Sequence, residues 1–247
     1  MVTNLEKAFS WLAFPVYAVQ GLRVRSRIQR MLPPAASAVA EIEGNGQPIR
    51  TLMIGDSSAA GVGVTEFHQS VAGGFPTLLA ELTGRPVYAR TCGNNSATTG
   101  QIRDFVLPHI EPLDYDYVVL SIGTNDAKNF HSGKRFCKEF GTLIYALRTR
   151  FPNARIIWSG IIDIGDIPAL PFPLNRILSI RSRILMQAGK TLCEERGALA
   201  PPSGWQPLPE NFAEDGFHCS AKGYGMWAKE LAGFIAKMEI SEATPKG

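Results

Sequence analysis

The stretch LMIGDSSAAGVGV, residues 52–64, begins as an apolar run and ends in small residues. Between these two parts lie Asp56, Ser57 and Ser58. A buried strand that stops at an acid and two hydroxyl groups is typical of a chain that presents polar side chains at the edge of a sheet. We therefore expect the chemistry of this protein to begin directly after this strand.

Apolar runs typical of buried strands recur along the chain, at residues 51–55, 87–92, 117–123 and 154–162. Segments with helical spacing alternate with them, at residues 75–83, 98–110, 134–150, 174–196 and 220–238. Alternation of strand and helix predicts an α/β fold, with a parallel sheet covered by helices on both faces.

Polar groups follow three of these strands: Asp56 and Ser57, then Gly93 and Asn94, then Asn125 and Asp126. In open parallel sheets, ligands bind beyond the carboxyl ends of the strands. Because these ends meet at one edge of the sheet, the sequence predicts that these groups share a site.

Three common motifs are absent from residues 52–64. No Lys follows Gly61 or Gly63, as a phosphate-binding loop would require, and the dinucleotide motif GxGxxG lacks its third glycine. The lipase motif GxSxG fails because Ala59 stands two residues after Ser57. Nucleotide binding is thereby disfavoured, while a nucleophilic serine in another setting stays open.

Ser57 needs a base and a group that orients the base. His68, His109 and His131 have no acid at a suggestive spacing. Asp215 precedes His218 by three residues, in EDGFHCSAKGYG, where a turn enters the last helical segment. This spacing lets the carboxylate hold Nδ1–H and leave Nε2 facing the serine. A turn Asp beside a helix cap is the alternative interpretation of the same motif.

Acyl transfer also requires hydrogen-bond donors for an oxyanion. Gly93 has no side chain to block its backbone N–H, and Asn125 offers a side-chain amide at the next strand end. The backbone N–H of Ser57 is the third candidate. Each residue alone also fits a tight turn or a helix cap.

The motifs GDSSAAG (55–61), Gly93, GTND (123–126) and DGFH (215–218) together resemble the four blocks of the SGNH (GDSL-type) hydrolase family, in the family's order. The resemblance covers about residues 50–238. It implies a flavodoxin-like three-layer α/β/α fold with a central parallel sheet, and a Ser-His-Asp esterase that needs no metal or cofactor.

Carried over residue by residue, the resemblance implies that Ser57 is the nucleophile, His218 the base and Asp215 its partner. Gly93, Asn125 and the Ser57 N–H match the oxyanion hole. Asp56 and Asp126 match acids that support the loops. Three positions depart from the family pattern: Ser58 replaces Leu, Ser96 replaces a second Gly, and Cys219 stands where Pro is frequent.

The substrate is predicted less sharply. We expect a small-molecule ester with a short acyl chain, such as an acetylated carbohydrate. A membrane-associated lysophospholipase or thioesterase is the alternative, acyl transfer to another alcohol stays open, and a catalytically silent binding protein is the alternative of another class. The Pro-rich segment 163–175 supplies candidate acyl-pocket residues: Ile164, Ile167, Leu170 and Phe172.

Charge and cysteines limit the partners. Residues 1–50 hold six basic and three acidic residues, which accounts for the whole net charge of +3, so the remainder is neutral. We therefore predict no nucleic-acid partner. The four cysteines form no CxxC pair, which favours free thiols and a cytoplasmic protein, although one disulfide stays open.

Residues 1–32 are predicted to form an amphipathic helix, with Pro15 as a kink. The segment fits a signal peptide poorly and is short for a membrane span. It is expected to pack on its own domain or on a second copy, or to lie on a membrane surface. The predicted organisation is this helix with a linker (1–48, the linker being 33–48), the hydrolase domain (49–240) and a tail (241–247).

Overall fold

The computed structural model describes residues 2–35, 39–202 and 208–243. The described residues form a five-stranded sheet in the order β1-β3-β2-β4-β5. Its strands are β1 (Val39–Ile42), β2 (Ile49–Gly55), β3 (Val87–Gly93), β4 (Tyr117–Ser121) and β5 (Arg155–Trp158). Strands β2 to β5 run parallel, and β1 pairs antiparallel with β3 at the edge. The expected α/β/α fold is confirmed, with a mixed and mostly parallel sheet.

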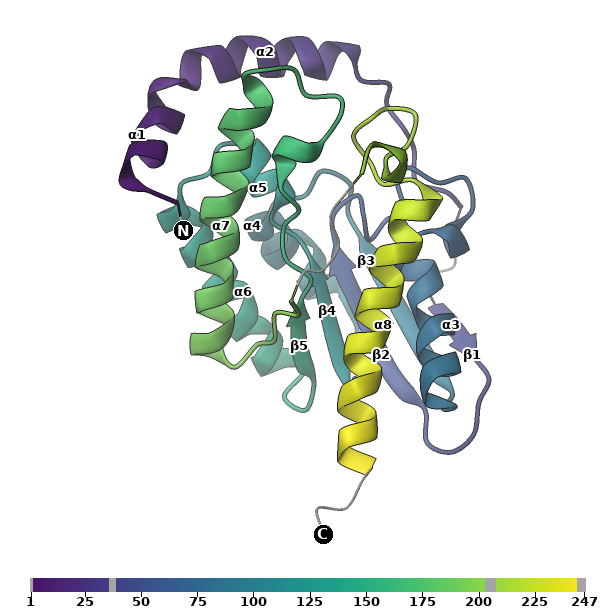
Figure 1. Cartoon of the computed structure of the whole chain (residues 1–247). Coiled ribbons are helices and arrows are strands. Elements are labelled where there is room, and N and C mark those ends of the chain that lie inside the picture. Colours follow the sequence, from purple (N-terminus) through teal and green to yellow (C-terminus); the bar gives the residue numbers. More distant parts are fainter. Residues whose placement is uncertain (1, 36–38, 203–207, 244–247) are drawn as a thin grey trace.

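Helices cover both faces of the sheet (Figure 1). One face carries α3 (Val71–Thr83) and α8 (Ala221–Ala243), and the other carries α6 (Gly133–Arg150) and α7 (Leu174–Arg196). Leu52 and Ile54 pack toward α6 and α7, while Met53 between them packs toward α3 and α8. A strand whose successive side chains enter two separate cores reads as one continuous apolar run, which explains the sequence pattern.

Local chemistry sets several helix boundaries. The Ser70 hydroxyl accepts the N–H of Gly73 at 3.0 Å and caps α3, and the Ser132 hydroxyl accepts the N–H of Arg135 at 3.2 Å and caps α6. Such caps satisfy backbone donors that a helix leaves free at its first turn. Residues 98–110, expected as one helix, form three short turns: α4 (Thr99–Gln101), a π turn (Ile102–Val106) and a 3₁₀ turn (Leu107–His109).

Three other expectations need correction. The linker prediction for residues 33–48 is wrong at Val39–Ile42, because this segment completes the sheet as β1. The fourth strand ends at Trp158, and residues 159–162 belong to no strand, although the Ser159 N–H still donates to the Leu120 carbonyl of β4. The last helix continues to Ala243, into the predicted tail.

The N-terminal segment forms two helices, α1 (Asn4–Leu12) and α2 (Phe14–Arg27), where one kinked helix was predicted. The break lies at Ala13, and Pro15 stands in the first turn of α2, where a missing N–H costs nothing. In Figure 1, α2 lies across the end of the molecule at which α7 and α8 begin. This is the carboxyl end of the parallel strands. No helix in the described ranges is long and apolar enough to cross a membrane.

Candidate active site

The polar turn after β2 carries the predicted nucleophile. Residues 56–63 form consecutive tight turns, in which the Ala60 N–H donates to the Asp56 carbonyl and the Val62 N–H to the Ser57 carbonyl. Ser57 is half-buried and lines a cavity of about 500 Å³. Asn125, from the short helix after β4, and His218, from the loop before α8, line the same cavity. The structure thus brings the predicted nucleophile, base and amide donor to one space at the carboxyl edge of the sheet.

Gly63 allows the His218 loop to lie against this turn. Its φ of +111° belongs to the left-handed region, which side chains disfavour. A Cβ at this position would lie 2.3 Å from the Cys219 carbonyl oxygen and 3.0 Å from the His218 Cβ. Gly63 therefore makes room for the loop that carries the predicted base.

Asp215 holds His218 at three points. His218 Nδ1 lies 2.6 Å from Asp215 Oδ2, and the backbone N–H groups of Phe217 and His218 each donate to Oδ1 at 2.9 Å. The Asp215 side chain has no exposed surface. Burial raises the pKa of this carboxyl, but the three hydrogen bonds outweigh burial and hold the pKa below its ordinary value. Asp215 is therefore a buried anion that orients the ring and leaves Nε2 free.

Neither the Ser57 hydroxyl nor His218 Nε2 hydrogen-bonds another side chain among the described residues. Both remain available for a ligand in the shared cavity. The hydrogen bond between a nucleophilic serine and its imidazole base often forms fully only when substrate binds.

Asn125 lines the cavity, but its amide is already engaged. The Nδ2 group donates to Asp56 Oδ2 at 3.0 Å and to the Ala97 carbonyl at 3.1 Å. Two acceptors use both hydrogens of the amide. A contact to an oxyanion therefore requires Asn125 to share one of these hydrogens.

Asp56 supports the floor of the site. Oδ1 accepts the N–H and the hydroxyl of Ser58, at 3.1 Å and 2.9 Å, and Oδ2 accepts the Asn125 amide. Burial raises the pKa of Asp56, while the hydrogen bonds from Ser58 and the charge of Lys128 oppose this rise. The role of a loop-supporting acid, expected from the resemblance, agrees with these contacts.

Gly93 ends β3, paired in register with Gly55 at the end of β2. A Cβ at Gly93 would lie 2.3 Å from the Ala60 nitrogen. The strand end thus presses against the turn that carries Ser57, and only glycine fits there. Gly93 is not among the residues that line the cavity, so its predicted oxyanion contact stays a prediction.

Of the four candidate acyl-pocket residues, Ile167 lines the cavity. Ile164 and Leu170 are buried in the core on the α6–α7 face, and Phe172 is 77% exposed. The prediction of an acyl pocket is therefore corrected for these three residues: the 163–175 segment covers the core and contributes one side chain. The remaining apolar lining includes Ile161, Ile162, Trp227, Leu231 and Phe234.

Sequence patterns missed the contribution of α8 to this cavity. Trp227, Leu231 and Phe234 follow one another at four- and three-residue spacing, which indicates an apolar helix face. That signal alone does not tell a core face from a cavity wall.

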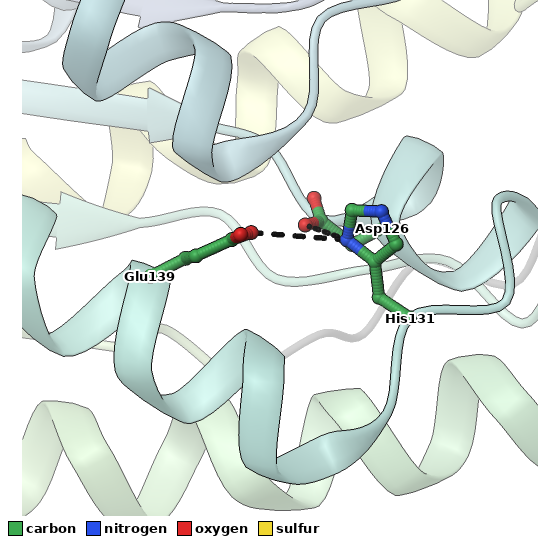
Figure 2. A group of neighbouring side chains, drawn as sticks. All are labelled: Asp126, His131 and Glu139. Atoms are coloured by element: carbon green, nitrogen blue, oxygen red, sulfur yellow. Dashed lines mark hydrogen bonds and ion pairs between the residues drawn. The ribbon is translucent and has the colours of Figure 1, made fainter.

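Asp126, His131 and Glu139 form a group in which Asp126 and His131 are buried and Glu139 is partly buried (Figure 2). His131 Nδ1 lies 3.0 Å from Asp126 Oδ1 and 3.8 Å from Glu139 Oε2, and Asp126 Oδ2 accepts the Thr99 N–H and hydroxyl. These atoms are of the type that a divalent cation binds. Asp126 hydrogen-bonds to Thr99 of α4 and to His131, and so ties α4 and the 129–132 loop to α5 (Thr124–Lys128), the helix of Asn125. The group therefore supports Asn125.

The four cysteines are free thiols in the structure. Burial raises the pKa of Cys219, next to His218, to about 12, and the carboxylates of Asp56 and Asp215 act in the same direction. A thiol of this kind stays protonated near neutral pH and is a weak nucleophile. Ser57 therefore remains the nucleophile candidate at this edge.

Known proteins share sequence or fold with this chain. The model of the GDSL-like lipase/acylhydrolase family matches residues 53–226. A GDSL-like esterase of Mycobacterium tuberculosis is 26% identical over 194 residues, which cover 74% of this chain and 60% of that protein. The match thus spans 60% of that relative's length, which is less than two thirds.

Solved structures share the fold. A lipase/acylhydrolase from Enterococcus faecalis aligns with a TM-score of 0.59 at 18% identity, over 77% of this chain and 96% of that one. A carbohydrate acetylesterase from Sinorhizobium meliloti aligns with a TM-score of 0.59 at 17% identity, over 77% and 99%. Phospholipase A1 from Streptomyces albidoflavus aligns with a TM-score of 0.53 at 15% identity, over 74% of this chain and 98% of that one.

Proposed function

The chain belongs to the GDSL-like lipase/acylhydrolase family, and on that premise we propose that it is a serine esterase that hydrolyses short acyl esters through Ser57, His218 and Asp215. One observation carries the proposal. The buried Asp215 anion holds His218 Nδ1 at 2.6 Å, and His218 opens with Ser57 into one cavity. A serine, a base and a buried acid in this order are what acyl transfer requires.

In the first half-reaction, the Ser57 hydroxyl oxygen attacks the ester carbonyl carbon, and its proton passes to His218 Nε2. Asp215 stabilises the imidazolium that forms. The Ser57 and Gly93 N–H groups and the Asn125 amide hold the carbonyl oxygen as it becomes negative. The tetrahedral intermediate then collapses, and the alcohol leaves with the proton from His218.

In the second half-reaction, water attacks the acyl-enzyme while His218 takes a proton from it. Collapse releases the carboxylic acid, and the proton returns to Ser57. These two half-reactions require no metal or organic cofactor. An alcohol in the place of water would make the same residues an acyltransferase.

We favour a short acyl group, with an acetylated carbohydrate as the natural ester. The resemblance in fold to a carbohydrate acetylesterase supports this class. The alternative substrate is a lysophospholipid or thioester at a membrane. The position of α2 beside the site and the apolar side chains of α8 in the cavity are the observations that support it. A small-molecule ester is the partner in both cases. A cytoplasmic location remains our proposal, because free thiols suit it.

Hydrolysis of a p-nitrophenyl ester series from acetate to palmitate tests the proposal, with wild type beside Ser57→Ala. We expect a maximum at acetate or butyrate that the variant lacks. A maximum at long chains would select the lipid alternative. Equal rates in both proteins would exclude Ser57 as the nucleophile.

A fluorophosphonate probe separates an enzyme from a silent binding protein. We expect wild type and Ser58→Ala to be labelled at Ser57, and Ser57→Ala to remain unlabelled. Ser58→Ala is the matched control, because it removes the neighbouring hydroxyl and keeps the proposed nucleophile. Absence of label on folded wild type would favour the binding protein.

A further inference from the structure

The N-terminal helices expose an apolar stripe. On α1, Leu5, Phe9 and Leu12 follow one another at helical spacing, and Leu5 and Leu12 are each 81% exposed. On α2, Val19 and Leu22 are exposed as well, with Leu22 69% exposed. Contiguous exposed apolar residues of this kind mark interaction surfaces more often than single exposed side chains do.

The opposite side of the same helices is firmly packed. The Tyr17 ring lies 4.6 Å from the Phe130 ring, and its hydroxyl donates to the Lys128 carbonyl at 2.6 Å. Gln20 Nε2 donates to the Phe172 carbonyl at 3.2 Å, and the Trp11 ring meets Phe130 edge-on at 5.1 Å. These contacts orient the helices, so the apolar stripe faces outward in the folded protein.

Arginines gather on α2 and in the segment directly after it. Residues 13–35 contain no Asp or Glu, and the arginines in them are Arg23, Arg25, Arg27 and Arg30. All four are exposed, and none forms an ion pair with another described residue. Arg23 and Arg27 line a cavity shared with Glu214 and Asp215, while Arg25 and Arg30 do not. Arg25 and Arg30 therefore remain available to an external anion.

We propose that the outward surface of α1 and α2 binds an anionic lipid membrane, with the apolar stripe among the acyl chains and the arginines at the headgroups. An amphipathic helix that combines a leucine-rich face with unpaired basic residues lies stably in such an interface. A second copy of the chain would have to supply matching acids, and α1 and α2 carry one acid, Glu6, which pairs with Arg183 at 3.2 Å.

This surface lies beside the proposed catalytic residues. The second cavity has α2 on one side and Asp215 on the other. After α2 the chain passes over the nucleophile turn, where a Cβ on Gly61 would lie 3.4 Å from Pro34 Cδ. Membrane binding therefore places the catalytic edge near the lipid. Resting on the proposed function, this makes short acyl esters of membrane-borne amphiphiles the substrate class that the site meets there.

Vesicle flotation tests the proposal without using catalysis, so that its failure and the failure of the proposed function are distinguishable. The full chain, with Ser57 intact or as Ser57→Ala, is mixed with vesicles of phosphatidylcholine, alone or with phosphatidylglycerol. We expect both proteins to float with the anionic vesicles, and added salt to weaken binding because it screens the arginines.

Two variants test the surface. Arg25→Gln/Arg30→Gln is expected to weaken binding to anionic vesicles roughly 25-fold, at about fivefold per arginine. Leu5→Ser/Leu12→Ser/Leu22→Ser is expected to weaken it more than roughly 100-fold. Hydrolysis of soluble p-nitrophenyl acetate by the leucine variant should match wild type, which shows that it is folded.

Matched controls change the same number of exposed residues elsewhere. Lys134→Gln/Lys138→Gln removes two exposed charges on α6, and Leu82→Ser/Phe105→Ser/Tyr145→Ser removes three exposed apolar side chains on other elements. Both should bind vesicles as wild type does. The proposal is overturned if wild type does not float with anionic vesicles, or if the controls lose binding as much as the two variants do. It is also overturned if wild type does not bind vesicles and sedimentation shows instead a dimer that only the leucine variant abolishes.

Discussion

Asn125 Nδ2 donates to Asp56 Oδ2 at 3.0 Å and thereby joins α5, the short helix after β4, to the turn after β2. The second amide hydrogen goes to Ala97, in the segment that follows β3. One side chain thus connects three strand ends at the floor of the cavity. The candidate oxyanion donor and the acid that supports it belong to one hydrogen-bonded unit.

Asn125→Ala is expected to lower kcat by roughly 10²–10³ with little change in KM, because its amide would act mainly in the transition state. Steady-state kinetics on p-nitrophenyl acetate measures this. A near-native kcat would remove Asn125 from the proposed oxyanion hole.

Asp56→Asn is expected to lower kcat by about tenfold, less than Asn125→Ala does. The new amide has one acceptor oxygen, so it cannot accept from both Ser58 and Asn125, and one pair of donors must face each other. Kinetics and chemical unfolding of the variant check this. Unchanged activity and stability would show that the Asp56 carboxylate does not position Asn125.

Asp215→Asn is expected to lower kcat by about 10⁴, because the wrong tautomer of His218 is favoured. The same carboxylate also links stability to pH. Its pKa is lower in the folded protein, so it stabilises the fold fully above its ordinary pKa of 3.8, and this contribution is lost as pH falls through the lower native value.

Thermal unfolding of wild type and Asp215→Asn between pH 7 and pH 2 measures the linkage. The difference in stability between the two proteins should shrink as the solution becomes more acidic. A difference that is independent of pH would show that the carboxylate charge does not contribute.

Gly63→Ala is expected to reduce activity at least tenfold and to destabilise the protein. The positive φ strains any side chain, and a Cβ would collide with the Cys219 carbonyl and push away the His218 loop. Gly225→Ala is the matched control, because nothing lies within 4 Å of its Cβ inside α8. The control should be as active as wild type and slightly more stable. Equal behaviour of the two variants would contradict this role of Gly63.

Cys219→Ala should retain most of its hydrolytic activity, and iodoacetamide at mildly alkaline pH should not inhibit wild type. Cys219 is buried and its pKa is raised to about 12, so its thiolate is scarce. Rate measurements before and after alkylation, with the modified residue identified by mass spectrometry, test this. Rapid inactivation through labelling of Cys219 would contradict it.

Long periodic elements were predicted well from the sequence. The helix expected at 174–196 is α7 with the same bounds, and the apolar runs at 51–55 and 87–92 lie within β2 and β3. Repeated burial of one helix face, or of both faces of a strand, leaves a pattern in the chain itself. The Asp215–His218 pair was predicted equally well, because the two residues lie three apart in one turn, which brings their side chains together.

The sequence by itself determined the alternation of strands and helices, the polar residues at the strand ends and the local Asp215–His218 turn, since each depends on neighbours along the chain. Only the tertiary structure decided that 39–42 pairs with β3, that Asn125 is bound to Asp56 and Ala97, and that α2 borders the site. It also decided that α8 and Ile167 line the cavity, and that Phe172 does not. These relationships join residues far apart in the chain, so they arise from how the elements pack and leave no local pattern to read.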